Sequence, residues 1–259
     1  MRVGIIGAGN MAAAMARGWS AARGEPGAPE SILLADAAPE KASVLAEEVG
    51  GESVAGNREL AEASDLVVLA VKPNVLDEVA PELADTGTPV VSILAGTPLA
   101  RLQEALPGVP VVRVMPNLGA QVRQAVLCVA YPDGTADEQR QEVDSLLGLL
   151  GDVIELDEGL IDAATALMGC APGYLAMIAE TLVEAGEDEG LTEDQAKRMV
   201  ARSMVATGGL LDLRDPGELK RAVASPGGMT EAGLAALEEH GLHEALLAAV
   251  EASLERARA

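Results

Sequence analysis

Histidine and cysteine are scarce in this sequence. The two histidines, His240 and His243, lie together in LEEHGLHEAL near the C-terminus, and the two cysteines, Cys128 and Cys170, lie in unrelated contexts. Two isolated cysteines form neither a disulfide framework nor a CxxC metal site, and no further histidine or cysteine accompanies the histidine pair. We therefore predict no metal site, and a Ser-His-Asp or Cys-His hydrolase is disfavoured. So few cysteines fit a reducing cytoplasm.

Basic residues are also few. Lys and Arg total 18 against 41 Asp and Glu, which gives a net charge of −23. Phosphate backbones and anionic membranes repel so acidic a chain, so we expect neither as a partner. We interpret the acidity as a well-hydrated surface suited to high salt. No uninterrupted apolar stretch reaches the roughly 18 residues of a membrane span, and the start lacks the pattern of a signal sequence. These absences predict a cytoplasmic protein.

Apolar residues are plentiful, at 49% of 259 residues, which suffices for one large domain or two smaller ones. In the first part of the chain, short β-rich runs alternate with helical patterns. The predicted strands are 2–7, 31–36, 65–71, 88–94, 111–115 and 125–130. This alternation predicts a parallel sheet with helices on both faces and right-handed crossovers.

Beyond residue 156 the β-rich runs cease and helical patterns continue to the end. Helices are predicted over 159–189, 192–213, 216–224 and 229–257, with Pro172 interrupting the first and a break near Gly241 in the last. The predicted fold class is α/β, with an α/β domain at 1–156 followed by an all-α domain at 157–259. Broad apolar faces on the later helices predict at least a homodimer.

The opening stretch, GIIGAGNM, places Gly7 and Gly9 between a strand and a helix. Glycines there allow a tight turn and the approach of backbone N–H groups to a pyrophosphate. Asp36 ends the second strand, where a dinucleotide fold places the acid that binds the adenosine ribose, so it favours NADH over NADPH. The alternative for Asp36 is a strand-end cap, and Lys41 or Arg58 could still reach a 2′-phosphate.

Three further loops follow predicted strands, at 70–76, 92–99 and 113–120. Ligands bind at the carboxyl ends of the strands in open α/β sheets, so these loops predict one shared site. Alternatively, Pro73 and Pro116 are turn formers and Lys72 is a solvated charge.

Five stretches together, GIIGAGNM, AVKP, SILAG, RVMPN and LKRAVASPGGMTEAGLAALEEHG, resemble the pyrroline-5-carboxylate reductase family from end to end. The resemblance implies reduction of a cyclic imine, 1-pyrroline-5-carboxylate, to L-proline by NADH or NADPH, the last step of proline biosynthesis. It also implies that residues 1–156 form a Rossmann-type dinucleotide-binding domain, that the helical domain at 157–259 binds substrate and serves dimerisation, and that homodimers or larger homo-oligomers form.

The resemblance also implies site residues. The cofactor would be bound by Ile6, Gly7, Ala8, Gly9, Asn10, Met11, Asp36, Asn57, Ala70, Val71, Lys72, Pro73, Met115, Pro116 and Asn117. The substrate carboxylate would be bound by Ser225, Gly227, Gly228, Met229 and Thr230, with the Thr230 hydroxyl beside the ring nitrogen as the catalytic group.

The chemistry of the backbone independently supports the predicted substrate-binding residues. Gly227 and Gly228 precede a predicted helix, where free N–H donors and the positive helix end suit a carboxylate. The alternative is a plain turn with Thr230 as the N-cap. We expect this bend to face the Gly7 turn across a single crevice.

Three departures from the family pattern leave the substrate open. MGCAPGY at 168–174 replaces SGSGPAY, MPNLGA replaces MPNTPA, and Met229 is bulkier than the usual threonine or alanine. A less polar pocket could take a larger cyclic imine, and a non-catalytic relative is the further alternative. A 3-hydroxyacid dehydrogenase is disfavoured, because neither Lys197 nor Lys220 stands in the required Gly-x-x-Gly-x-x-x-Lys context.

Overall fold

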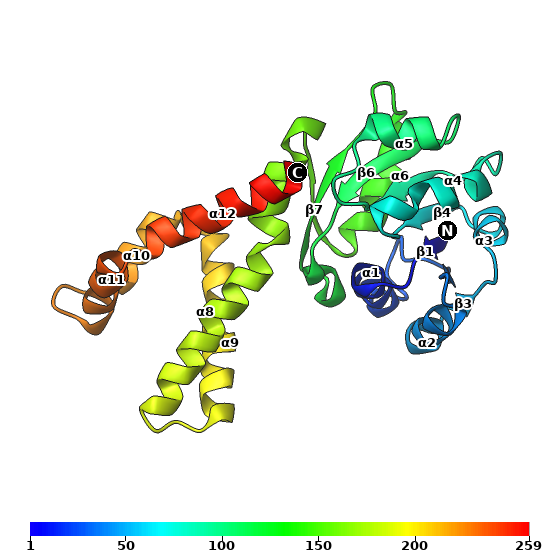
Figure 1. Ribbon diagram of the computed structural model, residues 1–259. Coiled ribbons are helices and arrows are strands. Elements are labelled where there is room, and N and C mark those ends of the chain that lie inside the picture. The colour runs from blue at the N-terminus through cyan, green and yellow to red at the C-terminus, as the bar shows by residue number, and fades with distance from the viewer. Residues whose placement is uncertain (259) are drawn as a thin grey trace. The chain divides into compact units, whose positions relative to one another are not determined.

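An eight-stranded sheet forms the centre of the first of two units in the computed structural model, which describes residues 1–258 (Figure 1). The first unit runs from Met1 to Gly169 and the second from Cys170 to Ala257. The strands are β1 (Arg2–Ile6), β2 (Ser31–Ala35), β3 (Glu52–Ser53), β4 (Leu66–Leu69), β5 (Val90–Ser92), β6 (Val111–Met115), β7 (Ala125–Ala130) and β8 (Gly151–Glu155). Their order across the sheet is β3-β2-β1-β4-β5-β6-β7-β8.

The sheet is mixed, so the expectation of a wholly parallel sheet is wrong at one place. β6 and β7 pair antiparallel, with Val114 opposite Val129, whereas the other neighbouring strands pair parallel. Only the short 3₁₀ helix η2 (Leu118–Val122) separates β6 from β7, and a parallel pair needs a longer crossover. The patterns also missed β3, which has two residues, and β8, which is half exposed and carries acidic residues.

Helices cover both faces of the sheet, as the apolar strands predict. They are α1 (Asn10–Ala21), α2 (Pro39–Val49), α3 (Asn57–Ala63), α4 (Leu76–Leu83), α5 (Leu99–Ala105), α6 (Asp137–Gly148) and α7 (Ile161–Ala164), with 3₁₀ turns η1 (Pro73–Val75) and η3 (Glu158–Leu160). Successive residues of a strand point to opposite faces, so Ile5 packs in the core under α1 and Ile6 in the core under α3 and α4. The Trp19 indole is buried in the first core and donates to the carbonyl of Leu146 at 2.9 Å.

The parallel strands bring their carboxyl ends to one edge of the sheet. β1, β2, β4, β5 and β6 all run in one direction, so the loops that follow them share this edge. The loops predicted to form one ligand site therefore lie along a single rim.

The second unit consists of helices α8 (Ala171–Asp188), α9 (Glu193–Leu211), α10 (Pro216–Val223), α11 (Met229–Glu239) and α12 (Leu242–Arg258). The interruption predicted at Pro172 is present, because α7 passes into a π-helical turn at Thr165–Gly169 and α8 starts afresh with Pro172 in its first turn. Tyr174 connects α8 to α12, since its hydroxyl lies 2.5 Å from the Ser253 hydroxyl.

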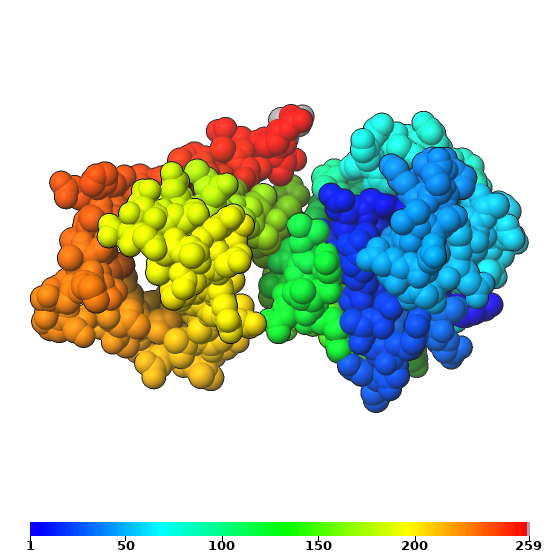
Figure 2. Space-filling model, turned by 90° about the horizontal axis from the view of Figure 1, so that it is seen from below, coloured from blue at the N-terminus to red at the C-terminus, as the bar shows by residue number. Residues whose placement is uncertain are grey.

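This unit has little apolar core of its own. Among its described residues only Ala196 and Leu219 are buried hydrophobics, while many large ones, Met177 and Val205 among them, are more than half exposed. In Figure 2 its surface, yellow to red, is hollowed between α9 and the segment that carries α10 and α11. An apolar surface of this extent needs cover from another surface.

Among the residues that the structure describes, one helical span has the length and apolar composition to cross a membrane. It is Glu158–Asp188, with a hydropathy of 1.4 over its best window, of which 11% is buried. The span was not apparent from the sequence, because it contains no uninterrupted apolar stretch of roughly 18 residues.

Candidate functional site

The turn after β1 has the geometry of an anion-binding loop. Gly7 has a φ of +102°, and a Cβ there would lie 2.6 Å from the Ala70 carbonyl oxygen, so only glycine fits without strain. Gly9 is the N-cap of α1, and no side chain caps that helix, so its first N–H groups have no side-chain partner. Helix and turn together offer donors and a positive helix end to a diphosphate.

A cavity of about 590 Å³ opens beside this turn, at the carboxyl ends of β1, β2 and β4. That volume lies within the range of small-molecule sites. The cavity is lined by eight of the residues predicted to bind the cofactor: Ile6, Gly7, Gly9, Asp36, Asn57, Ala70, Val71 and Lys72. The structure thus brings the adenosine and pyrophosphate parts of the predicted site together.

Other members of the predicted cofactor set lie outside that cavity. Ala8 and Asn10 line a neighbouring cavity of about 400 Å³ between α1 and α2, together with Lys41, which lines both cavities. Met11 is half-buried and Pro73 is exposed, and neither lines either cavity.

Both oxygens of the Asp36 carboxylate accept hydrogen bonds from backbone N–H groups. One oxygen accepts the Ala8 N–H at 2.7 Å and the other accepts the Ala38 N–H at 2.9 Å. Asp36 therefore caps the strand end, which is the alternative that the sequence left open, and it also lines the cavity. Among the cations considered for a 2′-phosphate, the Arg58 guanidinium donates to the carbonyls of Pro81 and Ala84, whereas Lys41 lines the cavity beside Asp36.

The predicted nicotinamide-side residues Met115, Pro116 and Asn117 are buried at the end of β6. Met115 packs with Leu99, Cys128 and Ile161 in a small apolar cluster. The Asn117 side chain makes three hydrogen bonds within the protein, accepting the N–H groups of Gly119 and Val126 and donating to the Met168 carbonyl. These side chains serve local packing, and none lines the 590 Å³ cavity.

The proline-diglycine bend lies in the second unit. Gly227 has a φ of +71°, its N–H donates to the Glu231 carboxylate at 2.7 Å, and the Gly228 N–H donates to the Ser225 carbonyl at 2.8 Å. Gly228 is the N-cap of α11, so Thr230 is not the N-cap but the second helical residue. The first N–H groups of α11 have no intrahelical partner and remain suited to an anion. Met229 is 94% exposed. That this bend faces the Gly7 turn stays a prediction.

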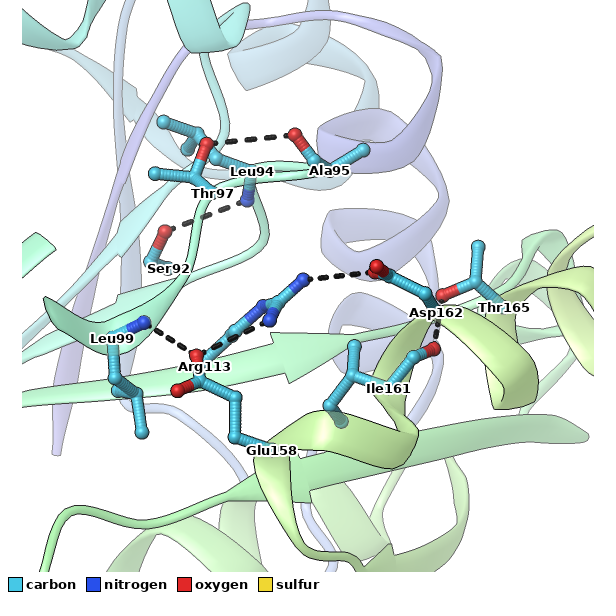
Figure 3. A network of polar contacts seen from close by, with 10 residues as sticks. All are labelled: Ser92, Leu94, Ala95, Thr97, Leu99, Arg113, Glu158, Ile161, Asp162 and Thr165. Atoms are coloured by element: carbon cyan, nitrogen blue, oxygen red, sulfur yellow. Dashed lines mark hydrogen bonds and ion pairs between the residues drawn. The ribbon is translucent and has the colours of Figure 1, made fainter. Parts of the chain in front are cut away.

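Sequence reasoning missed a polar cluster at the rim, shown in Figure 3. Arg113 on β6 is 5% exposed, and its guanidinium nitrogens lie 3.2 Å from a Glu158 oxygen and 3.4 Å from an Asp162 oxygen. Glu158 also accepts the N–H of Leu99, the first residue of α5. Within residues 1–258, the Arg113 Nε atom is the one buried side-chain polar atom without a partner. An arginine inside the apolar run VVRVM was the available signal.

Another cavity, of about 850 Å³, is lined by Tyr131 and Arg140 and by no residue of the glycine turn. Its polar groups bind one another: Arg140 pairs with Glu155 at 2.6 Å, and the Tyr131 hydroxyl donates to Asp144. Burial, and then the contact with Asp144, raise the pKa of Tyr131 far above its usual value, so it stays protonated. No group of three or more potential metal ligands occurs among the residues that the structure describes.

Two family models match the chain. The pyrroline-5-carboxylate reductase dimerisation model covers residues 158–259, and a model described as NADP oxidoreductase, coenzyme F420-dependent, covers residues 2–96. Curated pyrroline-5-carboxylate reductases are similar over the full length. The one from Corynebacterium melassecola is 34% identical, covering 98% of this chain and 96% of the relative, and the one from Synechocystis is 33% identical, covering 100% and 97%.

Solved structures agree in fold. The 1-pyrroline-5-carboxylate reductase of Streptococcus pyogenes superposes with a TM-score of 0.88 at 29% identity, covering 99% of this chain and 98% of the other. The Plasmodium falciparum pyrroline carboxylate reductase with NADP bound gives 0.87 at 25% identity, covering 99% and 97%. An imine reductase of Streptomyces aurantiacus, at 20% identity and a TM-score of 0.57 over 100% of this chain and 93% of the other, shares the fold.

Proposed function

Because the chain belongs to the pyrroline-5-carboxylate reductase family, we propose that it reduces 1-pyrroline-5-carboxylate to L-proline with NADH or NADPH. The observation that carries the proposal is the likeness over the full length, combined with the Gly7 turn and the cavity beside it. The glycine turn has no room for a Cβ, and the N-terminus of α1 is open, so these residues fit the diphosphate of a nicotinamide cofactor.

The cofactor supplies the hydride when bound, and the chain's residues bind and orient the reactants. Gly7, Gly9 and the first turn of α1 would hold the diphosphate, and Asp36 and Asn57 would lie toward the ribose. In the second unit, Ser225 and the N–H groups at the start of α11 would hold the substrate carboxylate. The chemistry needs no strong protein acid, because the imine nitrogen is protonated in solution and C5 then accepts the hydride.

The Thr230 hydroxyl would orient the ring nitrogen by a single hydrogen bond. Its removal should cost about 1–2 kcal/mol, which is a factor of about 5–30 in rate. The test mixes purified protein with the imine and either cofactor and follows the nicotinamide absorbance. Thr230→Val should slow turnover by that factor, whereas Thr230→Ser retains the hydroxyl and serves as the matched control. A wild-type protein that oxidises neither cofactor with this imine contradicts the proposal.

Cofactor preference depends on two groups of opposite charge. The Asp36 carboxylate is fixed by two backbone N–H groups at the cavity, where it repels a 2′-phosphate, while Lys41 would attract one. We propose that Asp36 prevails and that NADH is preferred. An NADPH preference above about tenfold in kcat/KM, which is about 1.4 kcal/mol, contradicts this.

The helical part would complete its core in a homodimer or larger homo-oligomer. Support comes from the dimerisation model at 158–259 and from the small number of buried residues in the second unit. We propose functional domains at 1–156 and 157–259, the latter mediating association, in a cytoplasmic enzyme. Light scattering on the purified protein should give at least twice the mass of 26.4 kDa, and cell fractionation should recover the protein with the cytosol.

A second candidate is reduction of a larger, more apolar cyclic imine. The specific observation is that Met168 and Cys170 stand where the family carries small polar residues, and that the exposed Met229 is likewise bulkier than the usual residue of its motif. Competing imines of increasing ring size, assayed with one cofactor, separate the two. The candidate is supported if kcat/KM rises with ring size and is rejected if pyrroline-5-carboxylate is the best substrate.

A further inference from the structure

One face of the RVMPN motif contacts a single segment of the chain. Residues 113, 115 and 117 alternate along the strand and its extension, so their side chains lie on the same side. Arg113 pairs with Glu158 and Asp162, and Met115 belongs to the same apolar cluster as Ile161, against which Met168 packs. Asn117 donates to the Met168 carbonyl. The segment 158–169 is therefore held to the rim at both of its ends.

The Asn117 side chain has little hydrogen-bonding capacity left for a cofactor. Its Oδ1 accepts the N–H groups of Gly119 at 3.1 Å and Val126 at 3.3 Å, and its Nδ2 donates to the Met168 carbonyl at 3.1 Å. The residue is 9% exposed. A side-chain amide has two acceptor lone pairs and two donor hydrogens, so one donor remains. This geometry disagrees with a role as a direct nicotinamide ligand through the side chain.

The segment that Asn117 holds is a π-helical turn, Thr165–Gly169, at the end of the first unit. Such turns are rare and are frequent at functional sites. The turn runs directly into Cys170 and Pro172 of MGCAPGY, the stretch that the family pattern associates with the imine pocket. Its position thus sets where that stretch begins.

Arg113 holds the other end of the segment at an energetic cost. A buried guanidinium with an unpartnered Nε is expensive, and apolar side chains of similar volume would often stabilise a core as well or better. The cluster is therefore weak evidence of stabilisation, while it ties Glu158 and Asp162 to β6.

We propose that Asn117 is a positioning residue for hydride transfer, which acts by holding the π-helical turn Thr165–Gly169 against the end of β6, with Arg113 and Asp162 as its support. This inference rests on the proposed function. Misplacement of reacting groups lowers the rate of the chemical step more than the affinity for either reactant. Loss of the Asn117 donor therefore lowers kcat and leaves cofactor binding unchanged.

The test variant is Asn117→Asp, whose carboxylate still accepts the N–H groups of Gly119 and Val126 but cannot donate to Met168. We expect kcat to fall by about tenfold or more, equivalent to about 1.4 kcal/mol, with the cofactor Kd, measured by nicotinamide fluorescence, within about twofold of wild type. Asp162→Asn should lower kcat in the same direction by a smaller factor. The matched control is Asp65→Asn, which alters an ion pair with Arg2 at the opposite ends of the strands and should leave kcat unchanged.

A second readout does not depend on turnover. Alkylation of Cys170, which directly follows the π-helical turn, should accelerate in Asn117→Asp, whereas Cys128 is buried and burial raises the pKa of its thiol, so it should stay unlabelled in both proteins. If Cys170 is labelled faster in Asn117→Asp but the wild-type protein reduces no imine, the proposed function is overturned. The role of Asn117 in holding the π-helical turn is then retained.

If Asn117→Asp folds, either of two results overturns the inference. One is an Asn117→Asp variant with wild-type kcat and wild-type labelling. The other is a cofactor Kd raised about tenfold with kcat unchanged, which would restore the role of direct cofactor ligand. If Asn117→Asp fails to fold, Asp162→Asn decides, because the Asp162 side chain is 39% exposed and pairs with Arg113. Wild-type kcat and labelling in that variant would then overturn the inference.

Discussion

Replacing Gly18 by alanine tests how closely helix α1 approaches η2. Gly18 lies inside α1 and is buried. A Cβ there would lie 2.2 Å from the Ala120 carbonyl oxygen and 2.5 Å from a Leu150 methyl group. At an open helix position the same change would stabilise the protein by about 1 kcal/mol. Here overpacking against a backbone carbonyl costs about 3 kcal/mol, so the net loss is about 2 kcal/mol.

Thermal and urea unfolding measure this loss. A net 2 kcal/mol lowers Tm by about 4–8 °C in a protein of this size. The control is Gly148→Ala at the end of α6 in the same unit, where an added Cβ would meet no atom within 4 Å. That variant should be unchanged or more stable by up to about 1 kcal/mol. A Gly18→Ala protein as stable as wild type would refute the packing argument, because α1 would then have room to move from η2.

Three other perturbations should give results of known sign. Gly7→Ala should raise the Kd for the cofactor at least about tenfold in a fluorescence titration, because its φ is +102° and the Cβ would meet the Ala70 carbonyl oxygen; unchanged affinity contradicts this. The hydrogen bond from the Arg2 N–H, aided by the Arg2 charge, lowers the pKa of Asp65 against the opposing effect of burial. The stabilisation that accompanies this lower pKa is fully present above about pH 3.9, the pKa of an aspartate in the unfolded chain. It is lost as pH falls through the lower pKa of Asp65 in the folded protein. The stability difference between wild type and Asp65→Asn should therefore shrink below about pH 4, and a constant difference in melts contradicts the assignment. With a net charge of −23, raising the salt concentration should raise Tm, because the Debye length falls from about 10 Å at 0.1 M to about 3 Å at 1 M; a Tm independent of salt contradicts this.

The local pattern of apolar and turn-forming residues was sufficient to predict most of the strands and turns of the first unit. The apolar runs predicted six strands, and GIIGAGNM predicted a tight glycine turn. In the structure Gly7 has a positive φ in this turn and lies against Ala70, directly after β4. Pro172 predicted the helix interruption for the same reason, since its missing N–H acts on its own neighbourhood. The direction of each strand was harder to predict from the sequence. β7 runs antiparallel to β6 because the connection between them is too short for a crossover.

The roles of the side chains at the carboxyl edge of the sheet could not be predicted from the sequence pattern. Asp36 and Asn117 occupy motif positions, yet whether a carboxylate or amide is free depends on partners distant in sequence. Ala8 lies 28 residues from Asp36, and Met168 lies 51 residues from Asn117. The Arg113 cluster likewise joins residues 45 and 49 apart.

The amino-acid sequence alone thus determined the α/β class, the glycine turn, the helical second half and the family, because each rests on residues close together or on motifs in fixed order. Only the tertiary structure decided that β7 is antiparallel, that Asp36 caps its strand and that Asn117 holds the turn at Met168. The physical reason is that hydrogen bonds are saturable, and folding decides which distant groups compete for each donor and acceptor.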